Sequence, residues 1–132
     1  MRKLGMALVA AVVVAGCTET APTASGGGQA DVNRVAYQSS VRLAVGQSAI
    51  VHGKRSDQCG VLPSEAELAS AKANLDAQTE LGEFSFGNPG VRRSGSCRGN
   101  TPVRETIFTA TAPGQQVLRV HGDPVRVTVT AQ

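Results

Sequence analysis

The C-terminal part of the chain alternates apolar and polar residues in short runs that turn residues separate. In residues 125–130 every second residue is valine, and an arginine and two threonines fill the positions between and after them. Residues 106–111 and 116–121 form two earlier runs, and the sequences Pro-Gly and Gly-Asp-Pro lie between the three runs. Alternation with a period of two is typical of half-buried strands, and regularly spaced turns favour a sandwich of sheets.

Two further segments fit this pattern and one breaks it. Residues 41–53 read as two short strands on either side of a glycine turn, and residues 81–86 alternate again. Residues 63–75 are instead rich in alanine, glutamate and lysine, and Ser64 and Glu67 have the S-x-x-E spacing of a capping box. We therefore predict a mainly β fold, an antiparallel sandwich with one short inserted helix.

The N-terminus has the layout of an export signal. Arg2 and Lys3 provide a basic start, and an apolar run follows from Leu4 to Gly16. This run is too short for a hydrocarbon core of about 30 Å, which needs about 20 apolar residues. A basic start, a short apolar middle and small residues at the end are typical of a secretory signal peptide, which we assign to residues 1–16.

The apolar run ends in the sequence VAGC at residues 14–17, which resembles the lipobox of bacterial lipoproteins. In that family the cysteine carries a diacylglyceryl thioether and becomes the first residue of the mature protein. The resemblance implies a lipid on Cys17, the membrane as a partner, and an extracytoplasmic location at the cell envelope. An ordinary signal peptide that is cleaved nearby is the alternative.

The composition changes again after this cysteine. Residues 18–30 contain no large apolar side chain and cannot bury enough surface to offset the entropy of ordering. We therefore expect a flexible tether over residues 17–30 and a β-sandwich domain over residues 31–132.

A lipid on Cys17 changes the cysteine count. The chain has three cysteines, and Cys59 and Cys97 remain once Cys17 is modified. An even pair in an exported protein predicts a disulfide, and a redox-active pair is the alternative. No Cys-x-x-Cys sequence is present and the only histidines are His52 and His121, so we expect neither a metal nor a cofactor.

Charge and motifs narrow the classes of function. The formal net charge is +3, but two of the 13 basic residues are Arg2 and Lys3, which leaves 11 against 10 acidic residues. This balance argues against nucleic-acid binding, which needs a basic stripe or a reader motif. We find no Gly-x-Ser-x-Gly sequence, and we expect His52 and His121 to be surface or turn residues. No enzymatic activity is predicted.

The sequence FTATAPGQQVLRV, followed by VRVTV, resembles bacterial immunoglobulin-like β-sandwich domains. The sequence VRLAVGQSAIVHG, together with the later pattern F-x-A-x-x-P-G-x-x-x-L, is also similar to the layout of chagasin-like inhibitors of cysteine peptidases. Those small exported proteins have an immunoglobulin-like fold and block a papain-type cleft with three loops at one end of the sandwich. The resemblances imply an immunoglobulin-like fold for this chain.

The three inhibitory loops correspond here to residues 56–60, 95–99 and 122–126. The chain retains Gly60 of the family's N-P-T-T-G motif and Pro124 of its R-P-W motif. The layout implies that the first two loops are adjacent at one end of the sandwich, which would bring their two cysteines within reach of each other.

Four arginines lie in or beside a long predicted loop, residues 87–103, which is punctuated by glycine, proline, asparagine and serine. They are Arg92, Arg93, Arg98 and Arg104. Guanidinium groups bind carboxylates and phosphates through paired hydrogen bonds, so this loop is a candidate for recognising an anionic envelope polymer or an acidic envelope protein. A role in solubility alone is the alternative.

These observations favour a lipid-anchored cell-envelope protein that acts as a binding or interaction module for an unknown ligand. A chagasin-like peptidase inhibitor and an accessory subunit of a membrane complex are the alternatives.

Overall fold

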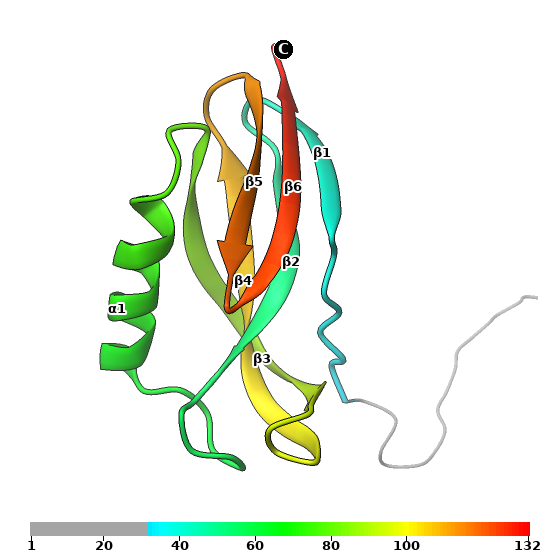
Figure 1. Ribbon diagram of the computed structural model, residues 1–132, viewed down its shortest axis with the longest axis vertical. Coiled ribbons are helices and arrows are strands. Elements are labelled where there is room, and N and C mark those ends of the chain that lie inside the picture. The colour runs from blue at the N-terminus through cyan, green and yellow to red at the C-terminus, as the bar shows by residue number, and fades with distance from the viewer. Residues whose placement is uncertain (1–31) are drawn as a thin grey trace, which may run out of the picture. The chain divides into compact units, whose positions relative to one another are not determined.

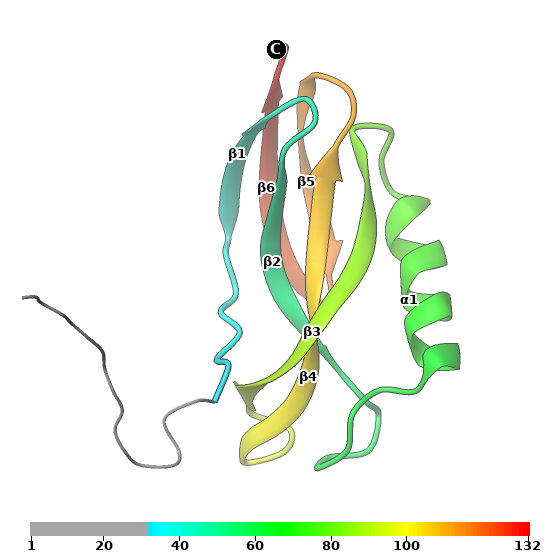
Figure 2. The ribbon, with the colours of Figure 1, turned by 180° about the vertical axis from the view of Figure 1, so that it is seen from behind.

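The computed structural model describes residues 32–132, which form six strands and one helix (Figures 1 and 2). The predicted signal peptide, Cys17 and the predicted tether lie outside the described residues. The elements are β1 (Ser40–Ala44), β2 (Ser48–Arg55), α1 (Glu65–Asp76), β3 (Gly82–Ser94), β4 (Gly99–Ala110), β5 (Gly114–Val120) and β6 (Asp123–Thr130).

The strands form two three-stranded sheets, in the orders β1-β6-β5 and β2-β4-β3. The predicted β-sandwich with one short inserted helix is confirmed. All strand pairs are antiparallel except β1 and β6, which are parallel. The valines that alternate in β6 are each at most 3% exposed, and they face Phe84 and Phe108 of the other sheet in one hydrophobic cluster.

The order of strands β2 to β6 matches an immunoglobulin sandwich in which a helix replaces one strand. In a constant-type immunoglobulin domain one sheet contains strands A, B, E and D and the other contains C, F and G. Here β2, β4 and β3 correspond to B, E and D, and β5 and β6 correspond to F and G, whereas β1 pairs with β6 and not with β2 as strand A would. The helix α1 occupies the position of strand C in the chain, between β2 and β3.

Side chains at the end of α1 and just after it cover one edge strand of each sheet, β3 and β5. Asp76 accepts a hydrogen bond from the backbone N–H of Phe84 in β3, at 2.8 Å, and Lys72 donates to the carbonyl of the same residue, at 2.8 Å. Gln78 likewise bonds both the N–H and the carbonyl of Arg119 in β5, each at 2.8 Å. The last turn of α1 and the residues just after it therefore protect one edge of each sheet, which would otherwise expose unpaired backbone groups.

The helix begins where the sequence predicts. Ser64 and Glu67 form the complete capping box, and the buried side chains of the helix are Leu68 and Leu75. No helix within residues 32–132 is long and apolar enough to cross a membrane.

The prediction of a long loop at residues 87–103 is wrong. Strand β3 continues to Ser94 and pairs with β4 from Gly99 onward, so only the tight turn at residues 95–98 is outside the strands. A register shift between Phe86 and Pro89 accommodates the proline, which an edge strand tolerates. Gly87 permits close packing, because a Cβ there would lie 2.6 Å from Oε1 of Glu105. Glycine and proline therefore mark a β-bulge here, not a loop.

Candidate functional site

A disulfide ties the two loops at one end of the sandwich. Cys59 lies between β2 and α1, Cys97 lies in the turn between β3 and β4, and their Cα atoms are 5.6 Å apart. The N–H of Gly60 also donates to Oγ1 of Thr101, at 3.1 Å. The predicted Cys59–Cys97 disulfide and its position on adjacent loops are confirmed.

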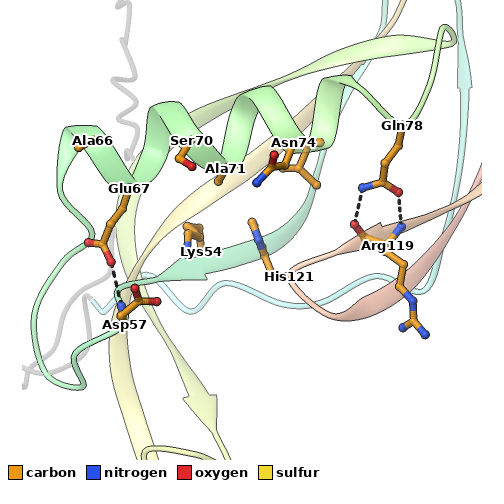
Figure 3. Close-up of a pocket in the computed structure, with 11 residues that line it drawn as sticks. Lys54, Asp57, Ala66, Glu67, Ser70, Ala71, Asn74, Gln78, Arg119 and His121 are labelled. Atoms are coloured by element: carbon orange, nitrogen blue, oxygen red, sulfur yellow. Dashed lines mark hydrogen bonds between the residues drawn. The ribbon is translucent and has the colours of Figure 1, made fainter.

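Two neighbouring cavities lie beside this end. The larger, the helix cavity, has a volume of about 540 Å³ and extends beneath α1 from Glu67 to Gln78 (Figure 3). The smaller, the arginine cavity, has a volume of about 180 Å³ and is lined by Lys54, Arg55, Ser56, Asp57, Arg92 and His121. Lys54, Asp57 and His121 line both cavities, so the two spaces meet at these side chains.

The arginine cavity contains three cationic side chains and one acidic residue. None of the ion pairs within residues 32–132 involves Lys54, Arg55 or Arg92. Arg92 donates through Nε to the carbonyl of Gly53, at 2.8 Å, and Arg55 donates to the carbonyl of Ser56, at 2.7 Å, so both guanidinium groups are oriented by neutral partners. Burial and the nearby charge of Arg55 lower the pKa of Arg92.

The glutamate nearest the arginine cavity, Glu67, is already engaged by other donors. Glu67 accepts from the N–H groups of Asp57 and Ser64, each at 2.9 Å, and from the hydroxyl of Ser56. The first two bonds are the main reason why the pKa of Glu67 is lowered to about 2. Glu67 therefore stays ionised and holds the β2–α1 loop in place, which also positions Ser56 beside the cavity.

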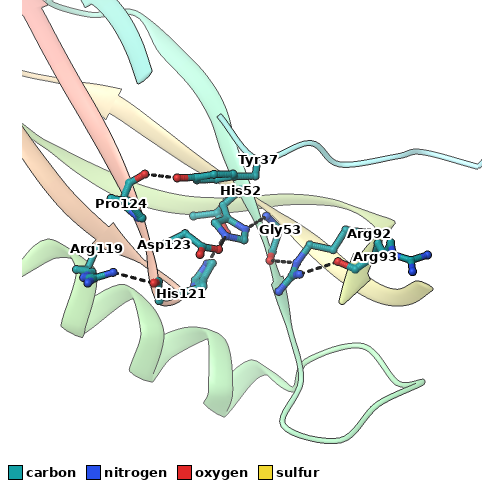
Figure 4. Close-up of polar contacts among 11 residues, drawn as sticks. Tyr37, His52, Gly53, Arg92, Arg93, Arg119, His121, Asp123 and Pro124 are labelled. Atoms are coloured by element: carbon teal, nitrogen blue, oxygen red, sulfur yellow. Dashed lines mark hydrogen bonds and ion pairs between the residues drawn. The ribbon is translucent and has the colours of Figure 1, made fainter. Parts of the chain in front are cut away.

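A cluster of polar side chains, among them His52 and Asp123, lies next to the arginine cavity (Figure 4). His52 is 1% exposed, and its Nδ1 accepts from the N–H of Gly53, at 2.8 Å. A neutral imidazole carries one proton, so Nε2 is the donor to Asp123 Oδ2, at 2.8 Å. Tyr37 stacks at a tilt against the same ring, with 5.1 Å between the ring centroids. With both nitrogens engaged, His52 has no free site to take a proton from a substrate.

His121 links this cluster to the two cavities. It lies in the turn between β5 and β6 with a φ of 52°. Its ring packs edge to face against the ring of His52, with 5.2 Å between the ring centroids. Its Nε2 lies 2.9 Å from Oγ1 of Thr106, a fully buried hydroxyl. Burial, with the charges of His52 and Lys54, lowers the pKa of His121 to about 3. The imidazole is therefore neutral at pH 7 and adds a polar group, without charge, to the cavity wall.

One of the two histidines agrees with the sequence prediction and the other does not. His121 is a turn residue, as expected, but the expectation that His52 would be at the surface or in a turn is wrong. A register shift between Ile50 and His52 in β2 lets Val51 and His52 both be buried, each at 1% exposure. A bulge of this kind defeats prediction from alternation.

The four predicted arginines do not line one common cavity. Arg92 lines the arginine cavity, and Arg93 and Arg98 are exposed at the disulfide end. Arg104 lies in β4 and donates to the carbonyl of Gly87, at 2.7 Å, beside a third cavity on the α1 side of the same sheet. The structure instead joins Arg92 to Lys54 and Arg55, which sequence reasoning missed; two consecutive basic residues at a strand end are their only signal.

Comparison with protein-family models, with curated proteins and with solved structures finds no match to this chain. In the part of the chain that the structure describes, no group of histidine, cysteine, aspartate and glutamate residues is arranged to hold a metal ion. The arginine cavity is thus the candidate functional site on its own geometry.

Proposed function

We propose that this protein is a binding module of the cell envelope, held at the membrane by a lipid on Cys17 and facing the extracytoplasmic side. Its ligand carries a compact oxyanion, a phosphate or a carboxylate, which enters the arginine cavity. The observation that carries this proposal is the set of three half-buried cations, Lys54, Arg55 and Arg92, none of which forms an ion pair with a described residue.

The size and chemistry of the cavity fit such a group. Its volume of about 180 Å³ corresponds to about six water molecules, which suits a phosphate or carboxylate but not a bulky head. Guanidinium groups bind both anions through charge-assisted hydrogen bonds. The adjoining helix cavity would take the rest of the ligand along Ser70 and Asn74. We assign no catalytic role to the side chains that line the two cavities.

Titration with two simple probes tests this function. Inorganic phosphate and glucuronate represent the two oxyanions, and amide chemical shifts of the protein report binding at low salt. Removing one charge-assisted hydrogen bond costs about 1.5–3 kcal/mol, so Lys54→Gln and Arg92→Gln should each weaken binding by roughly 10-fold or more. Arg93→Gln is the matched control, because it removes the same charge from the next residue of β3 but outside the cavity. Absence of saturable binding of both probes at millimolar concentration would refute the proposal.

The arrangement of loops favours a second candidate, a chagasin-like peptidase inhibitor. What supports it is that residues 56–60 and 95–99 lie at the end of the sandwich opposite the C-terminus, and that the turn after β5 faces the same way but lies partway along β3 and β4 (Figures 1 and 2). The sequence keeps only Gly60 and Pro124 of the family's first and third motifs. A papain assay distinguishes the two functions: an inhibitor would act at micromolar protein, whereas an oxyanion-binding module would leave papain fully active.

A further inference from the structure

The basic residues of the domain are concentrated at the disulfide end, and most of the acidic residues lie elsewhere. We define the basic end as residues 32–34, 54–62 and 91–100. It contains six of the 11 basic residues in the described chain, namely Arg34, Lys54, Arg55, Arg92, Arg93 and Arg98, but one of the eight acidic residues, Asp57. The rest of the domain has five basic and seven acidic residues. A near-neutral domain thus carries an excess of positive charge at one end.

The three segments of the basic end are physically joined. The disulfide connects residue 59 to residue 97, and Asn33 connects the first segment to β3: its side chain donates to the carbonyl of Pro89, at 3.0 Å, and its carbonyl accepts from Val91, at 2.8 Å. Arg34 forms an isolated parallel bridge with Val91. These bonds hold the segments together at the end opposite the C-terminus, as both ribbon views show (Figures 1 and 2).

The same end exposes apolar side chains. Val32, Val61 and Leu62 are 49%, 45% and 44% exposed, and they make up half of the six large apolar residues that the described chain exposes. Arginines beside exposed aliphatic side chains match an anionic lipid surface, where phosphates neutralise the arginines and the aliphatic groups enter the boundary of the acyl chains.

The position of the first described residues also favours a lipid surface as the partner. Val32 belongs to the basic end, and only 14 residues, 18–31, separate it from the proposed lipid on Cys17. The tether predicted from the sequence would, as a flexible chain of this length, span about 20 Å on average. Tethering at that distance gives an effective concentration near the millimolar range, so a weak surface is sufficient for contact.

We propose that the basic end docks on the anionic surface of the membrane to which the protein is anchored. Docking orients the domain with the disulfide next to the lipid headgroups and β1, β5 and β6 away from them. The orientation rests on the proposed anchor, whereas the affinity of the surface for anionic lipid does not, so the two are tested separately.

Vesicle binding without the lipid isolates the surface. The strands and the helix that the structure describes, and both disulfide cysteines, lie in residues 32–132, so a chain that starts at residue 17 contains this whole unit. With Cys17→Ser this chain cannot be acylated. We expect it to co-sediment with vesicles of phosphatidylglycerol and phosphatidylcholine, less so as salt rises, and not with phosphatidylcholine alone. Intact mass of the native protein tests the anchor independently.

Charge reversal tests the residues. Each arginine near an anionic surface contributes about fivefold to partitioning, so Arg93→Glu/Arg98→Glu should lower binding by roughly 25-fold or more. Arg42→Glu/Arg126→Glu makes the same change in net charge on exposed residues of β1 and β6, and should change binding little. Equal loss in the two double variants, or no binding of the parent chain to anionic vesicles, would overturn the proposal and would favour a protein partner for this end.

A fluorescent probe tests contact with the acyl chains. The chain has no tryptophan, so Leu62→Trp provides a single reporter, and Val117→Trp, at a site on β5 that is 51% exposed, is its control. On anionic vesicles the emission of Leu62→Trp should shift to the blue and be quenched by brominated acyl chains. Quenching of both reporters to the same extent, or of neither, would contradict the proposed orientation.

Discussion

The two sheets of the sandwich differ in regularity. The β1-β6-β5 sheet pairs without a register shift, and alternate residues of β6 are buried valines. The β2-β4-β3 sheet has shifts in β2 and in β3, and β3 and β4 are 13 and 12 residues long, so they extend toward the disulfide end. The first sheet contributes most of the aliphatic core, and the second carries the three cations of the arginine cavity.

The difference shows how this small domain separates stability from recognition. A regular sheet presents one apolar face to the core, so it contributes to stability more than to binding. A bulge in β2 breaks the alternation and buries His52 next to Val51, and the ends of β2 and β3 contribute Lys54 and Arg92 to the arginine cavity. Substitutions in the two sheets should therefore affect different properties.

Removal of the disulfide should have the largest effect on stability. On the chain-entropy model a loop of 38 residues is worth about 4 kcal/mol, so Cys59→Ser/Cys97→Ser should lower the free energy of unfolding by about that amount. Guanidinium denaturation measures it, and the wild-type protein under reducing conditions should match the variant. A loss below about 1 kcal/mol would show that the second sheet does not depend on its bridge.

Truncation in the regular sheet should come next. Leu118 of β5 is fully buried, so Leu118→Ala should cost about 3 kcal/mol from lost burial and the cavity that remains. Val117→Ala, at an exposed neighbour in the same strand, should stay within about 0.5 kcal/mol. Phosphate binding should survive in both variants while they are folded. Loss of binding in folded Leu118→Ala would contradict the separation of the two sheets.

The pH dependence of stability should depend on His121. Its folded pKa of about 3 is below the ordinary value of 6.5, so the unfolded chain binds more protons between these values. Stability is therefore fully present above pH 6.5 and is lost as the pH falls toward 3. Burial lowers the pKa of His52 as well, so it acts in the same direction. From pH 7 to 5 the contribution of His121 should fall by about 2 kcal/mol.

The variant His121→Asn isolates this contribution, because asparagine tolerates the positive φ at this turn. Urea denaturation at pH 7 and pH 5 should show a smaller loss in the variant than in the wild type. The interval avoids Glu67, whose lowered pKa makes its contribution decline only below about pH 4.5. Equal losses in the two proteins would mean that His121 is not the titrating group.

The smallest effects should come from the side chains at and just after the end of α1 that cover the sheet edges. Asp76→Ala leaves the N–H of the buried residue Phe84 without its acceptor and should cost about 1–2 kcal/mol. Gln78→Ala should cost less than about 1 kcal/mol, because Arg119 is exposed and water can replace the lost bonds. Thermal unfolding compares them, and a larger loss for Gln78→Ala would reverse the expected order.

Local chemistry explains what sequence reasoning predicted correctly in the fold. Alternating valines, a capping box at Ser64 and turn residues between the runs act within a few residues, so they can be read directly. The same rules failed at residues 87–103, because glycine and proline serve a bulge as readily as a loop. Only the packing against β4 and Asn33 distinguishes the two uses.

The candidate site was less accessible to prediction than the fold. Arg92 and Arg93 are consecutive, yet the period of a strand sends one into the cavity and leaves the other exposed. Lys54 and His121 are far apart in the chain and meet only because β2 ends beside the turn between β5 and β6. No local sequence pattern predicts that these two residues line the same cavity.

The sequence by itself determined the class of fold, the helix and the pairing of Cys59 with Cys97, because periodicity, capping and cysteine parity are local or countable properties. The tertiary structure decided which cations share a cavity, why His52 is buried and where the charge of the domain gathers. These depend on register shifts and on how the ends of separate strands pack, which are properties of the whole chain and not of any segment.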